Sequence, residues 1–159
     1  MPHEAGKSPP AASQTGAAPD MHRIVLPASP MAVRAALGDL RARWRNDGLS
    51  RSLCGTAEQV LAEVMNNIVE HAQADRDDGV IDLAITAEGS ELACLVRDDG
   101  EPMPNGALPA GQLAVVSDTL MALPEGGFGW FMIRSLTSDL RYARADGWNC
   151  LSFRIPEDV

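Results

Sequence analysis

The sequence predicts an α/β fold, an α+β two-layer sandwich whose mixed or largely antiparallel sheet is covered on one face by three helices. Two stretches in the first half of the chain repeat apolar residues at steps of three and four, which is typical of helices packed on a core. Two later stretches alternate apolar and more polar residues around a short glycine-containing turn, which is typical of a β-hairpin. Two further strand-like stretches close the chain.

The chain length of 159 residues suits one globular domain, and a hydrophobic content of 45% is enough to bury a core. Residues 1–20 are mostly Pro, Ala, Ser and Gly, so we expect a disordered tail that cannot offset the entropy of ordering. The formal net charge of -9 disfavours nucleic acid as a partner, and no apolar stretch approaches the roughly 20 residues that span a bilayer. We therefore expect a cytoplasmic protein with one domain at 21–159 and neither a nucleic-acid nor a membrane partner.

The first half of the domain is predicted to hold one strand and two helices. The strand is expected at 22–26, and a helix capped by Ser29 follows it and runs to about Trp44. The second helix is expected to start at Thr56, because a glutamine three residues later completes a capping box, and to end near Ala74.

A hairpin with strands at 80–87 and 91–98 is predicted next. Leu92, Cys94 and Val96 share their parity with Asp98, so this carboxylate is expected on the buried face of the sheet, where it needs a partner.

A long connection follows at 100–129, with a possible short helix at 112–123. Connections of this length are uncommon in compact domains and often cover a site, so we expect a lid. A helix starting after the last of its glycines and two closing strands, at 140–143 and 148–155, complete the predicted fold.

Glu63 and Asn67 form the first candidate site, because residues four apart on a helix lie next to each other on its surface. A carboxylate placed there can accept a proton from a hydroxyl group, and an amide oxygen can bind a hard cation. The alternative interpretation of the same pair is an ordinary solvated helix face.

Asp98 and Gly100 form the second candidate. A buried carboxylate is a strong acceptor for an exocyclic amine, and a glycine lets a planar ring approach the backbone closely. The alternative is a plain turn, since Asp-Gly is a common turn dipeptide.

The run from Gly126 to Gly129 leads into a predicted helix and forms the third candidate. Free amides at a helix start, together with the helix dipole, suit phosphate groups. The alternative is a loop without a ligand, and the strand before a Rossmann turn and the lysine of a P-loop are both missing.

The order of the three candidates resembles a known set of motifs. Glu63 to His71, Asp98 to Pro102 and Gly126 to Gly129 are similar to the N, G1 and G2 boxes of the Bergerat-type (GHKL) ATP-binding superfamily. Within it, the chain most resembles the anti-sigma-factor serine/threonine kinases, which are short and carry the same Glu-x-x-x-Asn and Asp-x-Gly-x-Pro forms. The resemblance implies the Bergerat fold and the binding of ATP with Mg²⁺.

The resemblance also implies a role for each matching position. Asn67 matches the ligand of the magnesium ion, and Glu63 matches the general base for the hydroxyl that is phosphorylated. Asp98 matches the residue that holds the adenine amine. Gly100 matches the glycine beside the base. Gly127 and Gly129 match the hinge of the lid over the phosphates.

For function, the resemblance implies a kinase that phosphorylates an anti-sigma-factor antagonist of the STAS type and regulates transcription by exchanging that partner for a sigma factor. It also implies a homodimer.

Two departures from the family pattern stand beside this resemblance. Trp130 occupies a position where the G2 box usually has a leucine, and the chain has no Lys or Arg from Glu101 to Ile133, so Arg134 is the first cation after the predicted lid. Because phosphoryl transfer normally uses cations, a non-catalytic ATP-dependent partner-binding module is an alternative. A detached histidine-kinase-like ATPase domain is another alternative, and a metabolic enzyme on an unrelated α/β fold is a third.

Overall fold

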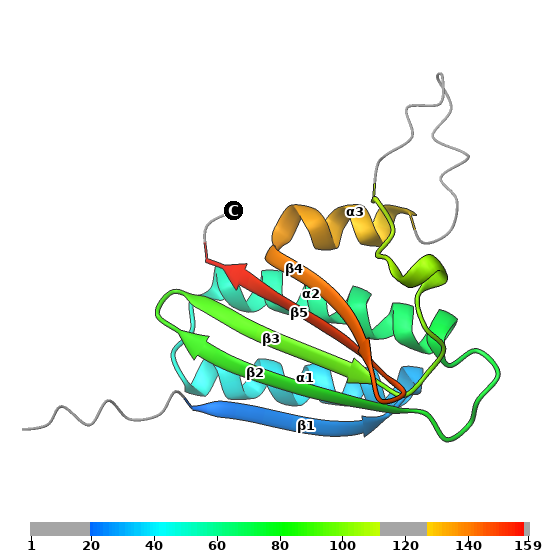
Figure 1. Ribbon diagram of the computed structural model, residues 1–159. Coiled ribbons are helices and arrows are strands. Elements are labelled where there is room, and N and C mark those ends of the chain that lie inside the picture. The colour runs from blue at the N-terminus through cyan, green and yellow to red at the C-terminus, as the bar shows by residue number, and fades with distance from the viewer. Residues whose placement is uncertain (1–19, 112–126, 158–159) are drawn as a thin grey trace, which may run out of the picture.

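The computed structural model describes residues 20–111 and 127–157. Five strands form one sheet in the order β1-β2-β3-β5-β4, and all four strand pairings are antiparallel (Figure 1). The bounds of the strands are β1 (Met21–Pro27), β2 (Val80–Glu88), β3 (Glu91–Asp98), β4 (Ser138–Ala145) and β5 (Trp148–Pro156). The predicted tail, apart from Asp20, and the short helix predicted at 112–123 lie outside the described residues.

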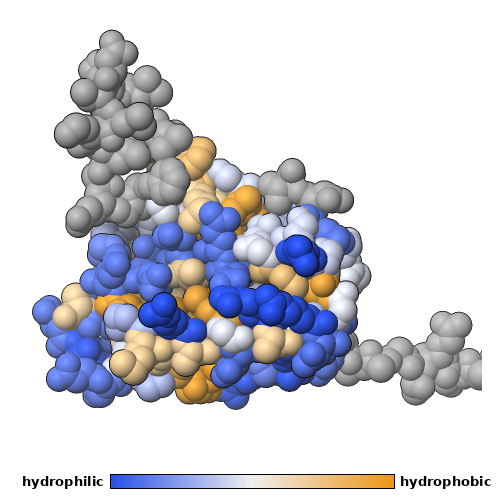
Figure 2. Space-filling view, turned by 180° about the vertical axis from the view of Figure 1, so that it is seen from behind, coloured by the Kyte–Doolittle hydropathy of each residue, from blue (hydrophilic) through white to orange (hydrophobic). Residues whose placement is uncertain are grey.

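Three helices form the second layer, which confirms the predicted two-layer fold. Their bounds are α1 (Pro30–Asn46), α2 (Arg51–Asn67) and α3 (Gly127–Leu136), with a π-helical segment η1 (Ile68–Ala72) and a 3-10 turn η2 (Pro104–Gly106). In Figure 1, α1 and α2 lie side by side behind the sheet, and α3 packs against α2. Seen from behind, this helix side presents mostly hydrophilic side chains interrupted by small apolar areas (Figure 2). No helix in the described part of the chain has both the length and the apolar composition that crossing a bilayer requires.

The core lies between the two layers and follows the predicted periodicities. In β3, Leu92, Cys94, Val96 and Asp98 are all buried, as their shared parity predicts. In α1 the buried residues recur at steps of three and four: Val33, Ala36, Leu40 and Trp44. The polar Asp98 is therefore held on the face of the sheet that the helices cover.

The second helix starts earlier than its capping-box pattern predicts. It begins at Arg51, with the Ser50 side chain accepting a hydrogen bond of 3.1 Å from the Leu53 amide. Leu53 is buried and extends the apolar face by one turn toward the N-terminus. The predicted start at Thr56 is wrong because this extra turn has a core contact and a cap of its own.

The end of α2 is also different from the prediction. After Asn67 the helix widens into η1, in which the Gln73 amide donates to the Ile68 carbonyl at 3.0 Å, five residues back. Short π-helical segments of this kind occur frequently next to functional sites. Here the widened turn faces the end of β3.

The sheet face opposite the helices carries an ion-pair cluster in which two partly exposed arginines surround the buried Asp82. Arg23 donates to both Asp82 oxygens, at 2.9 and 2.8 Å, and Arg97 donates to one of them. Hydrogen bonds from Arg23 and then from Arg97 lower the pKa of Asp82 to about 2, against the opposing effect of burial. Arg97 also lies over the Trp148 ring, 5.4 Å from its centroid. The cluster ties β1, β2, β3 and β5 together.

Candidate functional site

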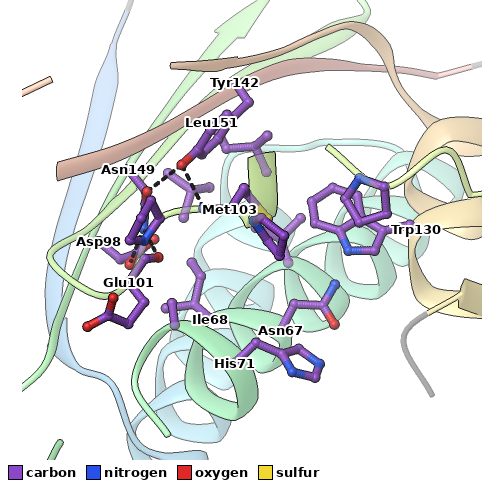
Figure 3. A pocket seen from close by; sticks show the side chains of 16 residues that line it. Asn67, Ile68, His71, Asp98, Glu101, Met103, Trp130, Tyr142, Asn149 and Leu151 are labelled. Atoms are coloured by element: carbon purple, nitrogen blue, oxygen red, sulfur yellow. Dashed lines mark hydrogen bonds between the residues drawn. The ribbon is translucent and has the colours of Figure 1, made fainter. Parts of the chain in front are cut away.

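A cavity of about 490 Å³ lies between the end of the helix layer and the sheet. Asn67 and His71 line it from α2 and η1, and Asp98 and Asn149 line it from the ends of β3 and β5. In Figure 3, Asp98 and Asn149 lie at one end of the cavity and Trp130, from α3, lies at the other. Residues from four separate segments therefore border one space.

The Glu63 and Asn67 side chains face the first turn of α3. A Cβ added to Gly129 would lie 2.8 Å from Glu63 Oε2 and 3.8 Å from Asn67 Nδ2, so only glycine fits at this point without displacing the carboxylate. Asn67 also lines the cavity, whereas Glu63 lies beside it without being part of its lining. The structure thus brings together the first and third predicted candidates, which are more than 60 positions apart in the sequence.

Asp98 lies at the opposite end of the cavity and is held there by two hydrogen bonds. Its Oδ1 atom accepts a hydrogen bond of 2.9 Å from the Gly100 amide and one of 3.1 Å from Asn149 Nδ2. Oδ2 accepts none from the residues that the structure describes. Burial raises the pKa of Asp98, and the two hydrogen bonds oppose that rise. Among the described residues, Asp98 therefore has one oxygen atom, Oδ2, that no donor engages.

Position 100 requires a glycine because the backbone there lies against the end of η1. A Cβ at this position would lie 2.3 Å from the Ala72 carbonyl oxygen, which is a backbone atom and cannot swing away. The same carbonyl accepts a hydrogen bond of 2.9 Å from the Glu101 amide. Gly100 therefore allows the chain after β3 to pack directly against the widened helix turn. This contact forms part of the cavity wall, which Ala72 and Glu101 line.

Asn149 is a site residue that the motifs did not identify. It is buried and stands directly opposite Asp98 in the pairing of β3 with β5. A signal was present in the sequence, since Asn149 shares its strand parity with Leu151 and Phe153, which are core residues. An amide at an alternating core position needs hydrogen-bond partners, and Asp98 is one of them.

The start of α3 differs from the prediction in its position. The helix begins at Gly127, two residues before the expected end of the glycine run, so Gly127 and Gly129 both lie in its first turn. Trp130 is buried and lines the cavity. Arg134 donates two hydrogen bonds, of 3.0 and 2.9 Å, to the Pro109 carbonyl. This cation therefore holds the chain segment before residue 112 against α3.

The residues near Asn67 fit a magnesium ion that is shared with phosphate groups. Among the described residues, the buried Asn67 Nδ2 group has no hydrogen-bond partner and is available to donate to a phosphate oxygen, and Asn67 Oδ1 is a hard oxygen atom of the kind that Mg²⁺ prefers. Over residues 20–111 and 127–157, no group of three or more His, Cys, Asp or Glu side chains could hold a metal. Magnesium commonly takes one or two protein ligands and completes its shell with phosphate oxygens and water, so this small donor set is sufficient.

Comparison with known proteins gives consistent matches. Residues 26–155 match the histidine kinase-like ATPase domain family. The serine/threonine-protein kinase BtrW of Bordetella bronchiseptica is 31% identical over 114 residues, which cover 71% of this chain and 74% of that protein.

Solved structures share the fold at lower sequence identity. The structure of the RsbU and RsbW domains of a Mycobacterium tuberculosis protein superposes with a TM-score of 0.60 at 20% identity, covering 86% of this chain and 32% of that one. The histidine kinase domain of a blue-light activated histidine kinase from Erythrobacter litoralis gives a TM-score of 0.50 at 21% identity, covering 78% of this chain and 60% of that one.

Proposed function

The chain belongs to the histidine kinase-like ATPase domain family, and on this premise we propose that it is an anti-sigma-factor-type serine/threonine kinase. In this proposal it binds Mg-ATP and phosphorylates a STAS-type anti-sigma-factor antagonist, which alternates with a sigma factor as the bound partner. The similarity to the BtrW kinase and to an RsbW domain supports this assignment. A homodimer and a cytoplasmic location belong to the same proposal.

The single observation that carries the proposal is the composition of one cavity. Asp98 offers a free acceptor atom at one end, and Asn67 and the first turn of α3 lie toward the other. A nucleotide has the same polarity, because it carries a donor amine on its base and anionic phosphates at the far end. Apolar side chains such as Ile68 and Met103 line the space between, as a flat base requires.

In this proposal each end of the cavity has its own task. Asp98 Oδ2 accepts a hydrogen bond from the exocyclic amine of adenine, and the first-turn amides of α3 face the phosphates, where the helix dipole favours negative charge. Asn67 would be the protein ligand of the magnesium ion, which would neutralise charge that develops on the phosphoryl oxygens.

Glu63 is the proposed general base. It takes the proton from a serine or threonine hydroxyl of the partner as that oxygen forms a bond to the γ-phosphorus. The bond from the γ-phosphorus to the bridging oxygen breaks, and ADP leaves with the electron pair. Glu63 is half-buried and lies beside the cavity rather than in its lining, so in this proposal the partner's hydroxyl would approach it from outside the cavity.

A non-catalytic ATP-dependent binding module is the second candidate, and Arg134 favours it. This residue is the first cation after a stretch without Lys or Arg, and it donates to the Pro109 carbonyl. A site that stabilises the transition state of phosphoryl transfer normally directs a cation toward the phosphates. In the binding module, ATP would set only the affinity for a partner.

A phosphorylation assay separates the two candidates. Purified protein with labelled Mg-ATP and a STAS-domain protein from the same genome should give a labelled STAS protein. Glu63→Gln should abolish this transfer and leave ATP binding within about twofold of wild type, because the change removes a base and no nucleotide contact. Absence of transfer by the wild-type protein, together with ATP-dependent partner binding, would favour the binding module.

A further inference from the structure

Asn149 is the centre of a hydrogen-bond network behind the proposed base site. Its Nδ2 group donates to Asp98 Oδ1 at 3.1 Å, to the Glu101 carbonyl at 2.8 Å and, more weakly, to the Gly100 carbonyl at 3.5 Å. Its Oδ1 atom accepts from the Tyr142 hydroxyl at 2.6 Å and from Arg144 at 3.0 Å. In Figure 3 the bonds run from Tyr142 through Asn149 to Asp98 along one wall of the cavity.

These partners fix the orientation of the Asn149 amide. Arginine can only donate, so the oxygen of the amide must face Arg144. Carbonyl oxygens can only accept, so the amide nitrogen must face Gly100 and Glu101. A flipped amide would place like groups against each other on both sides. The donor that Asn149 offers to Asp98 is therefore set by the surrounding chain.

The consequence for Asp98 is that its two oxygen atoms are no longer equivalent. Oδ1 accepts from Asn149 and from the Gly100 amide, while Oδ2 accepts from no described residue. An aspartate without the Asn149 contact could rotate and share its oxygens between the backbone and a ligand. With the contact in place, Oδ1 is engaged by two donors, and Oδ2 is the oxygen left for a ligand in the cavity that Asp98 lines.

We propose that Asn149 is a specificity-determining residue, which positions Asp98 so that the site selects a base with an amine at the six-position over a base with an oxygen there. The proposal rests on the proposed function, since it concerns the base of the same nucleotide. A fixed, acceptor-only oxygen attracts an amine and repels a carbonyl oxygen. Asn149 itself acts through Asp98 and is a positioning residue.

The same network reaches the chain segment after β3. The Tyr142 hydroxyl accepts a hydrogen bond of 3.0 Å from the Met103 amide while it donates to Asn149, and Arg144 donates to the Gly100 carbonyl at 2.7 Å. The β4–β5 hairpin therefore holds Asp98 and the backbone of residues 100–103 as one unit. Asn149 is the only side chain among the described residues that bonds both to Asp98 and to this backbone segment.

The test compares the affinity for ATP with the affinity for inosine triphosphate, whose base carries an oxygen in place of the amine. Both are measured by calorimetric titration of the full chain with magnesium present. We expect the wild-type protein to prefer ATP. Asn149→Leu, which keeps the number and branching of the side-chain heavy atoms but has no donor, should reduce the preference about tenfold, as expected for a contact to a charged group. Tyr142→Phe, which removes a single hydroxyl, should reduce it about threefold.

Two further variants separate positioning from a general loss of structure. In an Asp98→Asn background, Asn149→Leu should change the ATP preference by less than about twofold, because its effect passes through the Asp98 carboxylate. Gln73→Leu removes another buried amide, which donates to Asp99 outside the cavity. It should lower stability and leave the ATP preference unchanged.

Each outcome decides a different question. A wild-type protein that binds both triphosphates equally would contradict the base assignment and with it the proposed function. A wild-type preference for ATP that survives in Asn149→Leu would overturn the role of Asn149 alone. If Asn149→Leu does not fold, an unchanged preference in Tyr142→Phe would overturn it instead.

Discussion

The backbone of Gly129, in the first turn of α3, lies so close to Glu63 that a Cβ at this glycine would be 2.8 Å from the Glu63 carboxylate oxygen. The contact joins two segments from opposite halves of the chain, and Asn67 lies on the same side, 3.8 Å from the same point. The helix start that is proposed to face the phosphates is thus in contact with the proposed base.

Gly129→Ala tests this contact. The added methyl group should displace the flexible end of Glu63, so stability should change by less than about 1 kcal/mol while phosphoryl transfer falls on the order of a hundredfold. The measurements are a labelled transfer assay and denaturant unfolding. Gly38→Ala is the matched control, because a Cβ there has no neighbour within 4 Å. It should stabilise the protein by about 0.5–1 kcal/mol and leave transfer unchanged. Equal transfer rates in wild type and Gly129→Ala would show that the contact does not matter for catalysis.

Gly100→Ala, in contrast to Gly129→Ala, should lower the stability of the fold substantially. Its Cβ would lie 2.3 Å from the Ala72 carbonyl oxygen, and backbone must shift to accept it. We expect the free energy of unfolding to fall by about 1–3 kcal/mol, as for other overpacked sites, together with weaker ATP binding. Urea unfolding measures the first effect and calorimetry the second. A variant as stable as wild type would mean that the end of η1 and the chain after β3 are not packed as described.

The Asp82 cluster predicts a specific loss of stability in acid. Because its pKa is lowered from 3.8 to about 2 in the folded protein, the carboxylate stabilises the fold above its ordinary pKa. This contribution, about 2.5 kcal/mol at most, disappears as the pH falls from about 4 toward 2. Denaturant unfolding across this range should show a smaller acid-dependent loss for Asp82→Asn than for wild type. Identical losses in the two proteins would contradict the assignment.

Two substitutions of Arg134 test whether it supports ATP binding through its hydrogen bonds or through its charge. Its guanidinium donates twice to the Pro109 carbonyl, and Pro109 lines the cavity. Lysine keeps the charge but lacks the planar pair of donors. Arg134→Lys and Arg134→Ala should therefore weaken ATP binding by similar factors of about two to five, consistent with neutral hydrogen bonds. Wild-type affinity in Arg134→Lys would instead assign Arg134 an electrostatic role toward the phosphates.

Strand parity and helix spacing were sufficient to predict much of the candidate site. The shared parity of Asp98 with Leu92, Cys94 and Val96 predicts a carboxylate on the apolar face of its strand, and Asp98 is buried there. The four-residue spacing of Glu63 and Asn67 predicts neighbouring side chains on one helix face, and both lie close to Gly129 of α3. These are local rules, and they hold because each element buries one face.

Features that depend on contacts between distant segments could not be predicted in the same way. Both Ser50 and Thr56 are good N-caps, and only the packing of Leu53 in the core decides between them. Asn149 is opposite Asp98 because β5 pairs with β3 in one register, across 51 positions of sequence. Its parity with Leu151 marks it as buried, but the sequence does not name its partner.

The central claim is that three separated segments enclose one nucleotide, and a crystal structure of the protein with magnesium and a non-hydrolysable ATP analogue tests it most directly. The account predicts the adenine amine within hydrogen-bond distance of Asp98 Oδ2, the phosphates at the first turn of α3 and the metal ion bound by Asn67. A nucleotide bound elsewhere, or one in this cavity with its base away from Asp98 and its metal ion away from Asn67, would contradict it.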